Sequence, residues 1–178
     1  VVDSHEEVVR LAAIAAERDV VQDVLVRVTV GVEAHTHEYI ATAHEDQKFG
    51  LSLAGGQAAE GVRRVLAHPE LELLGVHSHI GSQIFDTGGH ELSARRLIAL
   101  YAETVRRHGV TMPELGLGGG FGIAYTSEHD PLEPKVLADQ LAGIVARECR
   151  AQDVPVPRIA VEPGRAIVGA TTITLSTV

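Results

Sequence analysis

The sequence predicts an α/β fold, as part of a (β/α)8 TIM barrel, from three observations. Apolar, β-branched segments alternate along the chain with amphipathic segments of helical period, an order typical of parallel βα units. The strand-like segments are apolar nearly throughout, as expected for parallel strands buried on both faces. Aromatic residues make up only 3% of the chain and Trp is absent, so the core must be built from Val, Leu, Ile and Ala.

The chain length limits how much of a barrel can form. A chain of 178 residues suffices for one domain with a sizeable core, but a complete barrel usually needs about 250 residues. Five predicted strands therefore indicate a partial barrel, although an open doubly wound sheet would show the same alternation.

Each element has a local signal. Val1 and Val2 have the character of a strand end, and Ser4 with Glu7 has the spacing of a capping box that opens a helix. The remaining elements are expected at 24–30 (strand), 58–66 (helix), 71–77 (strand), 91–108 (helix), 114–117 (strand), 132–152 (helix) and 158–161 (strand). Residues 173–178 alternate like one more strand, so both ends of the chain predict a piece of a longer protein.

Composition and charge exclude several classes of partner. The net charge of −9 argues against a nucleic acid or a membrane surface, because both require clustered positive charge. No apolar run reaches the ~20 residues of a membrane span, and no signal peptide is visible. Cys149 is the only cysteine, which excludes an internal disulfide and predicts a reducing, cytoplasmic location.

The residues suited to chemistry follow the carboxyl ends of predicted strands, where the active sites of α/β folds form. In the first such segment, His77 and His79 can contact a ring or a metal, while Gly81 and Ser82 offer an amide and a hydroxyl suited to phosphate. The alternative is an ordinary strand end whose histidines serve only the structure.

The second segment contains four glycines in five residues, Gly118, Gly119, Gly120 and Gly122. Such a stretch lets backbone N–H groups converge on an anion, whereas a tight turn needs only one or two glycines. It is neither a Walker loop, since no Lys-Ser/Thr follows, nor a clean G-x-G-x-x-G motif. The segment therefore predicts an anion site.

The third segment is Glu162-Pro163-Gly164-Arg165. Arg165 is well shaped for bidentate phosphate contact, and Glu162 ends a strand expected to be buried, so it needs a partner; a local salt bridge to Arg165 is the alternative interpretation. Phosphate sites of barrels commonly form from the loops after two consecutive strands. The second and third segments are therefore expected to hold one phosphate, beside a carboxylate suited to a ring nitrogen.

Three motifs together resemble the diaminopimelate decarboxylase family: His79-Ile80-Gly81-Ser82-Gln83, the glycine segment 118–122 and Glu162-Pro163-Gly164-Arg165. Residues 31–36 and 48–50 resemble its actinobacterial branch, so the resemblance covers essentially the whole chain. It implies a pyridoxal 5'-phosphate enzyme with an alanine-racemase-like barrel, which decarboxylates meso-2,6-diaminopimelate to L-lysine and CO2.

The resemblance also implies a role for each matching residue. His79 would stack on the pyridine ring and Glu162 would bond its nitrogen, and these two are the expected catalytic residues. The expected cofactor-binding residues are His79, Ser82, Gly118, Gly119, Gly120, Glu162, Pro163, Gly164 and Arg165. Arg165 is also expected to contact the substrate. Decarboxylation leaves a carbanion that a protonated ring absorbs, and an adjacent carboxylate favours that protonation.

Other parts implied by the resemblance are missing from the chain. The Schiff-base lysine is expected upstream, since neither Lys48 nor Lys135 follows a strand in the required motif, and Cys149 is not the cysteine of the family's C-terminal β-domain. The expected domains are 1–168, a partial barrel, and 169–178, the truncated start of that β-domain and its first strand. The resemblance further implies a homodimer that acts on a small amino acid, and the chain alone is expected to be inactive.

Three alternatives stay open. An ornithine or arginine decarboxylase of the same fold is the nearest, although Gln83 and Glu162-Pro163 favour diaminopimelate. A non-catalytic barrel that binds pyridoxal phosphate would suit the missing lysine. A metal-dependent barrel hydrolase would use histidines such as His35, His37 and His44, but these lack a pattern such as H-E-x-x-H, and a loop at the barrel rim is preferred.

Overall fold

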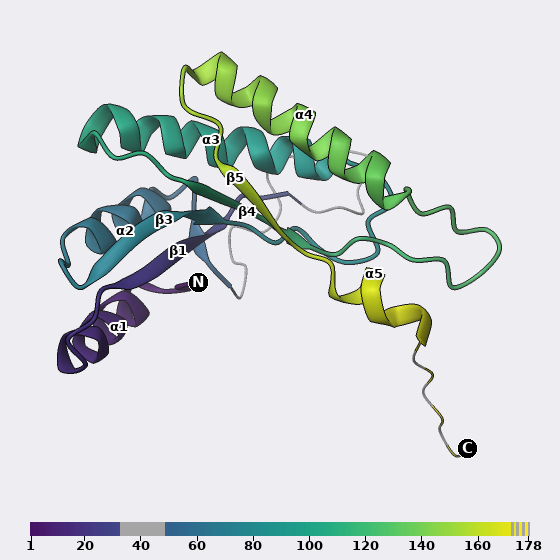
Figure 1. The fold of residues 1–178 in the computed structure, drawn as a ribbon, viewed down its shortest axis with the longest axis horizontal. Helices are drawn as coiled ribbons and strands as arrows, with labels where there is room; N and C mark the ends of the chain where they lie inside the picture. Colours follow the sequence, from purple (N-terminus) through teal and green to yellow (C-terminus); the bar gives the residue numbers. More distant parts are fainter. Residues whose placement is uncertain (33–48, 172, 174, 176, 178) are drawn as a thin grey trace.

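A computed structural model describes residues 1–32, 49–171, 173, 175 and 177. The elements in chain order are α1 (His5–Glu17), β1 (Gln22–Thr29), β2 (Leu51–Ser52), α2 (Gln57–Leu66), β3 (Leu71–His77), α3 (Gly88–His108), β4 (Glu114–Gly119), α4 (Pro134–Gln152), β5 (Arg158–Glu162), α5 (Gly164–Val168) and a 3-10 helix (Gly169–Thr171). Figure 1 shows α3 and α4 running together along the sheet, with α5 beyond the end of β5.

The described strands form one parallel sheet in the order β2-β1-β3-β4-β5. From β1 to β5 each long strand lies beside the next along the chain, so the order does not reverse as it does at the switch point of a doubly wound sheet. This is the order of a β/α barrel. The prediction of part of a (β/α)8 barrel is therefore confirmed, and the doubly wound alternative is wrong.

The first residues pair with β1 as expected for a strand end. Val2 forms an isolated parallel bridge with Val26, and the Ser4 hydroxyl caps α1 by accepting from the backbone N–H of Glu7 at 3.2 Å. The Glu7 carboxylate accepts from the N–H of Asp3 at 2.5 Å, whereas a capping box would use that of Ser4. Strand β2 was not predicted, because two residues are too short to show a periodic pattern.

Aliphatic side chains fill the interior, as the composition predicts. Residues that are at most 1% exposed include Val26, Val76 and Leu115 of the strands and Leu97 and Val145 of the helices that cover them. Strands β3 and β4 are mostly buried, so their sequences lack the alternation of a half-exposed sheet, whereas β5 at the sheet edge is partly exposed.

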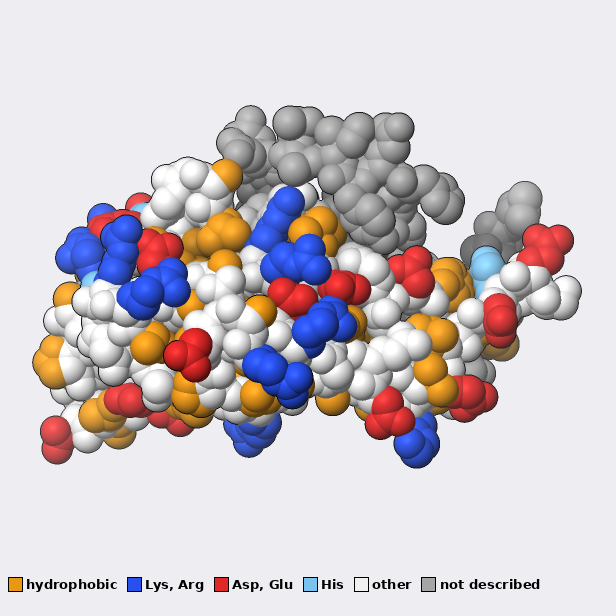
Figure 2. All heavy atoms as spheres, turned by 90° about the horizontal axis from the view of Figure 1, so that it is seen from above, with side chains coloured by type: hydrophobic (Ala, Val, Ile, Leu, Met, Phe, Trp, Pro, Cys, Tyr) orange, Lys and Arg blue, Asp and Glu red, His pale blue; other side chains and the backbone are white. Residues whose placement is uncertain are grey.

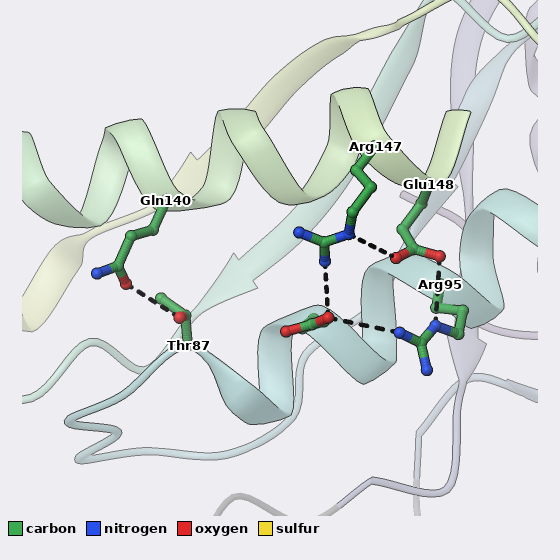
Figure 3. A network of polar contacts seen from close by, with 6 residues as sticks. Thr87, Arg95, Gln140, Arg147 and Glu148 are labelled. Carbon is green, nitrogen blue, oxygen red and sulfur yellow. Dashed lines mark hydrogen bonds and ion pairs between the residues drawn. The ribbon is translucent and has the colours of Figure 1, made fainter. Parts of the chain in front are cut away.

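Four charged side chains connect α3 to α4. Arg147 donates to Glu91 at 2.6 Å, and Arg95 donates to Glu148 at 3.2 Å. Weaker contacts of 3.4 Å, from Arg95 to Glu91 and from Arg147 to Glu148, close the network, which Figure 3 shows between the two helices. Acidic and basic side chains are intermixed over this face of the molecule (Figure 2).

Several predictions fall on residues that the structure does not describe. His35, His37, His44 and Lys48 lie outside the described residues, and so does every second residue of the strand expected at 173–178. Residues 169–171, at the expected start of the second domain, form a 3-10 helix. None of the helices in the described ranges is both long and apolar enough to cross a membrane.

Candidate active site

Three strand ends meet at one edge of the sheet. Strands β3, β4 and β5 are parallel neighbours, so the segments that follow them leave the sheet on the same side (Figure 1). Gly119 at the end of β4 pairs with Glu162 at the end of β5, and beyond the strands Ile84 pairs with Phe121. The structure therefore brings the three predicted segments together.

The glycines let these segments approach each other closely. A methyl group on Gly119 would lie 2.2 Å from the carbonyl oxygen of Glu162, and one on Gly120 would lie 2.0 Å from that of Gly81. Gly118 and Gly120 also have φ values of +68° and +86°, in the left-handed region that favours glycine. A side chain at either of the two close approaches would push the strand ends apart.

Arg165 and Ser82 come together although they are far apart in the sequence. The Arg165 guanidinium donates through Nη2 to the Ser82 hydroxyl at 2.9 Å and through Nη1 to the hydroxyl of Tyr125. No carboxylate of the described residues lies within ion-pair distance of Arg165, so the predicted alternative of a local salt bridge to Glu162 is wrong. Tyr125 was not predicted, since nothing in its loop sequence marks it.

Glu162 binds a histidine from β3. Its Oε1 lies 3.0 Å from Nε2 of His77, whose side chain is 6% exposed, while that of Glu162 is 57% exposed. The expectation of a buried Glu162 is wrong, because β5 is an edge strand of the described sheet. Burial lowers the pKa of His77, against the opposing attraction of Glu162, so the ring is neutral near pH 7.

His79 lies beyond the end of β3 and is exposed. Its Nδ1 accepts from the backbone N–H of Gly119 at 3.4 Å, and Gly118 leaves room for the ring, since a methyl group there would lie 3.2 Å from Nδ1. The ring is thus held beside the glycine segment with a free surface, as contact with a planar ligand requires.

Gln83 joins the first and second segments through its side-chain amide. It accepts from the N–H of Ile123 at 3.0 Å and donates to the carbonyl of Ile123 at 3.1 Å, which imitates a pair of strand hydrogen bonds. Its φ of +56° is unusual for a residue with a side chain. Sequence reasoning used Gln83 only for the resemblance and missed this structural contact.

The other candidate residues lie nearby or elsewhere. Pro163 is the N-cap of α5 and Gly164 is its first residue, so both lie between Glu162 and Arg165. Lys135 lies on α4, 86% exposed and paired with Asp139. No cluster of potential metal ligands occurs among the described residues.

Comparison with known proteins decides the family. The family model described as "Pyridoxal-dependent decarboxylase, pyridoxal binding domain" matches residues 1–169. The chain belongs to this family. At the strand ends, this pyridoxal-dependent decarboxylase domain presents the Arg165 guanidinium beside two hydroxyls, and the Glu162 carboxylate nearby.

Among curated relatives, the diaminopimelate decarboxylase of Mycobacterium tuberculosis is 56% identical over 179 residues, covering 98% of this chain and 40% of that protein. The diaminopimelate decarboxylase of Mycobacterium leprae is 57% identical over 182 residues, covering 98% of this chain and 38% of that protein. The chain thus spans about two fifths of the length of these relatives.

Solved structures of decarboxylases share the fold. Diaminopimelate decarboxylase from M. jannaschii in complex with L-lysine superposes with a TM-score of 0.80 at 30% identity, covering 93% of this chain and 37% of that one. The enzyme from Helicobacter pylori, also with L-lysine, has a TM-score of 0.73 at 27% identity, covering 93% and 39%. A lysine/ornithine decarboxylase from Vibrio vulnificus, at a TM-score of 0.64 and 21% identity over 92% and 37% of the chains, shows the fold alone.

Proposed function

We propose that this chain forms the cofactor-binding core of a pyridoxal 5'-phosphate enzyme that decarboxylates meso-2,6-diaminopimelate to L-lysine and CO2. One observation carries the proposal: the guanidinium of Arg165 is bonded to the neutral hydroxyls of Ser82 and Tyr125. Its positive charge is therefore not neutralised by any described carboxylate, and it lies where three strand ends meet.

The residues at the strand ends fit the two ends of pyridoxal phosphate. Arg165 and Ser82 would bind the phosphate by charge-assisted and hydroxyl hydrogen bonds. Gly118, Gly119 and Gly120 would let it approach the backbone, because these residues carry no side chains of their own. The family and these donors support the cofactor, and Gly164 and Pro163 would complete the phosphate site.

Glu162 and His79 would serve the ring of the cofactor. When bound, pyridoxal phosphate supplies an electron sink for the carbanion left by decarboxylation. Glu162 would keep a proton on the ring nitrogen, because a nearby negative charge favours the cationic form. His79, exposed beside the glycine segment, would stack on the ring and fix its orientation, and Arg165 would also contact the substrate.

The identity of the substrate rests on the relatives. The two mycobacterial relatives are named diaminopimelate decarboxylases, at 56% and 57% identity, and this supports diaminopimelate over ornithine or arginine.

The domain division and the assembly are part of the same proposal. A boundary after residue 168, followed by the first strand of a C-terminal β-domain, is supported by the end of the family match at residue 169. A homodimer is proposed for the full-length protein by resemblance alone. A cytoplasmic location is supported by the single cysteine, which is buried and free.

The test uses the full-length protein. Titration with pyridoxal phosphate, monitored by visible absorption, measures cofactor affinity. Release of CO2 from meso-diaminopimelate, ornithine and arginine measures substrate choice. Arg165→Met should weaken cofactor affinity at least tenfold, since a hydrogen bond to a charged group contributes about 1.5–3 kcal/mol. Arg158→Met, at the opposite end of β5, should leave it unchanged. Equal affinities of the wild type and Arg165→Met would refute the phosphate site.

A further inference from the structure

We propose that His77 is a positioning residue, which holds the Glu162 carboxylate in the orientation that the ring nitrogen of the cofactor requires. This inference rests on the proposed function. The resemblance assigns roles to His79 and Glu162 but none to His77, whereas the structure shows His77 in direct contact with Glu162.

The register of the sheet explains how His77 reaches Glu162 across a whole strand. His77 of β3 pairs with Gly116 of β4, which pairs with Ala160 of β5. Glu162 lies two residues beyond Ala160 and so shares its face of the sheet. Strands β3 and β5 are about 10 Å apart, twice the spacing of neighbouring strands, and the two side chains bridge this distance over β4.

Gly116 provides the space for this bridge. A methyl group on Gly116 would lie 2.9 Å from Cδ2 and 3.1 Å from Cβ of His77, so any side chain there would displace the ring. Contact between His77 and Glu162 therefore requires both the space above Gly116 and the length of the imidazole side chain. A side chain shorter than that of histidine at position 77 would not reach β5.

The surroundings of His77 select one protonation state. Its Nδ1 is buried without a hydrogen-bond partner among the described residues, so a proton on that atom would be unpaired. Burial also lowers the pKa of the imidazole, with the nearby Arg27 and His79 acting in the same direction. The neutral ring therefore carries its proton on Nε2 and donates it to Glu162 Oε1 at 3.0 Å.

A neutral donor suits the role proposed for Glu162. The Glu162 side chain is 57% exposed, and an exposed glutamate otherwise samples several rotamers. The bond from a buried ring selects one orientation and leaves the second carboxylate oxygen for another donor. Because neutral His77 adds no positive charge, Glu162 retains the negative charge that favours protonation of a ring nitrogen, which pairing with Arg165 would reduce.

A double-mutant cycle in the full-length protein tests this role. His77→Leu removes the donor at similar volume, and Glu162→Gln removes the charge. We expect His77→Leu to weaken cofactor affinity about tenfold, the scale of one hydrogen bond to a charged group, and to shift the visible absorption of the bound cofactor. The double variant should be no weaker than Glu162→Gln alone, because residues that act through one another are not additive.

Two further variants separate positioning from stability. His77→Gln retains an N–H at similar reach and should restore most of the affinity and absorption, while Gly116→Ala should reproduce the defect of His77→Leu. His68→Leu, at the opposite end of β3, is the matched control and should leave both unchanged. Additive losses in the cycle, or a His77→Gln variant as impaired as His77→Leu, would overturn the proposal.

The contact itself can be followed without cofactor. In protein with 15N-labelled histidine, Glu162→Gln should shift the His77 ring resonances and lower its pKa further, because the carboxylate raises it; unchanged resonances would also overturn the proposal. A wild-type protein that binds no pyridoxal phosphate would instead refute the proposed function. A wild type that binds it, with independent effects of the two variants, would refute only the role of His77.

Discussion

At the scale of the residue, close backbone contacts make Gly119 and Gly120 irreplaceable, and Gly120 is the sharper test. Gly120→Ala would place a methyl group 2.0 Å from the carbonyl oxygen of Gly81 at a φ of +86°. We expect the variant to lose cofactor binding and at least about 2 kcal/mol of stability, from the steric clash and the backbone strain. Denaturant unfolding and cofactor titration of the full-length protein measure both.

The matched control is a glycine without close neighbours. Gly143 lies within α4, and a methyl group there would have no atom within 4 Å. Gly143→Ala should therefore raise stability by about 0.5–1 kcal/mol through helix propensity and leave cofactor binding intact. If Gly120→Ala behaved like Gly143→Ala, the close approach of the strand ends would be wrong.

A second residue-scale prediction concerns pH. His90 is 1% exposed, and its ring stacks on Phe121 with centroids 5.3 Å apart. Burial lowers its pKa below the ordinary 6.5, against the opposing influence of backbone groups of Gly119 and Asp86. The unfolded chain then binds a proton more tightly than the folded one, so stability is complete above about pH 6.5 and falls as the pH drops towards the folded pKa.

Removing the titrating group should reduce this loss. In His90→Leu, the drop in melting temperature between about pH 7.5 and about pH 5.5 should be smaller than in the wild type. The difference is the part of the stability loss that comes from protonation of His90. The same calculation applies to His77, whose pKa is also lowered by burial, so part of the loss should remain. An identical pH dependence in both proteins would contradict a neutral, buried His90.

At the scale of the element, the charged network between α3 and α4 should contribute more to stability than an exposed ion pair on the same helix. Glu148 is 12% exposed at its side chain and accepts from Arg95 and Arg147 of both helices. Glu148→Gln should cost about 1–2 kcal/mol, because charge-assisted bonds to a mostly buried acceptor are lost. Denaturant unfolding measures the difference.

An exposed ion pair on the same helix provides the comparison. Lys135 and Asp139 are 86% and 68% exposed, and such pairs contribute little because water and salt screen them. Asp139→Asn should leave the unfolding midpoint unchanged. Equal effects of Asp139→Asn and Glu148→Gln would mean that the network of Figure 3 does not hold the two helices together.

At the scale of the whole molecule, β5 lies at an edge of the sheet that the described residues form. Val161 on this strand is 42% exposed, and Ile167 and Val168 after it are 68% and 55% exposed. An apolar pocket of about 380 Å³, lined by residues including Val161, Leu137 and Leu141, lies between β5 and α4. An open strand edge with apolar neighbours favours pairing with another chain.

We therefore expect the 178-residue chain to self-associate when it is prepared alone. Sedimentation should show species larger than a monomer, and Val161→Lys should shift the distribution towards monomer, since charge on an edge strand opposes pairing. Arg10→Ala, on the exposed face of α1 and away from β5, should not change it. A monodisperse monomer with a single sharp unfolding transition would contradict the expectation.

The sequence by itself determined the order of the elements, the aliphatic core and the three segments at the strand ends. These follow from local signals: helical period, β-branched runs, and glycines after strands. Only the tertiary structure decided which side chains meet, namely Arg165 with Ser82 and Tyr125, and Glu162 with His77. Such pairs depend on the register of neighbouring strands and on the space left by Gly116, and neither is encoded in the spacing of residues along the chain.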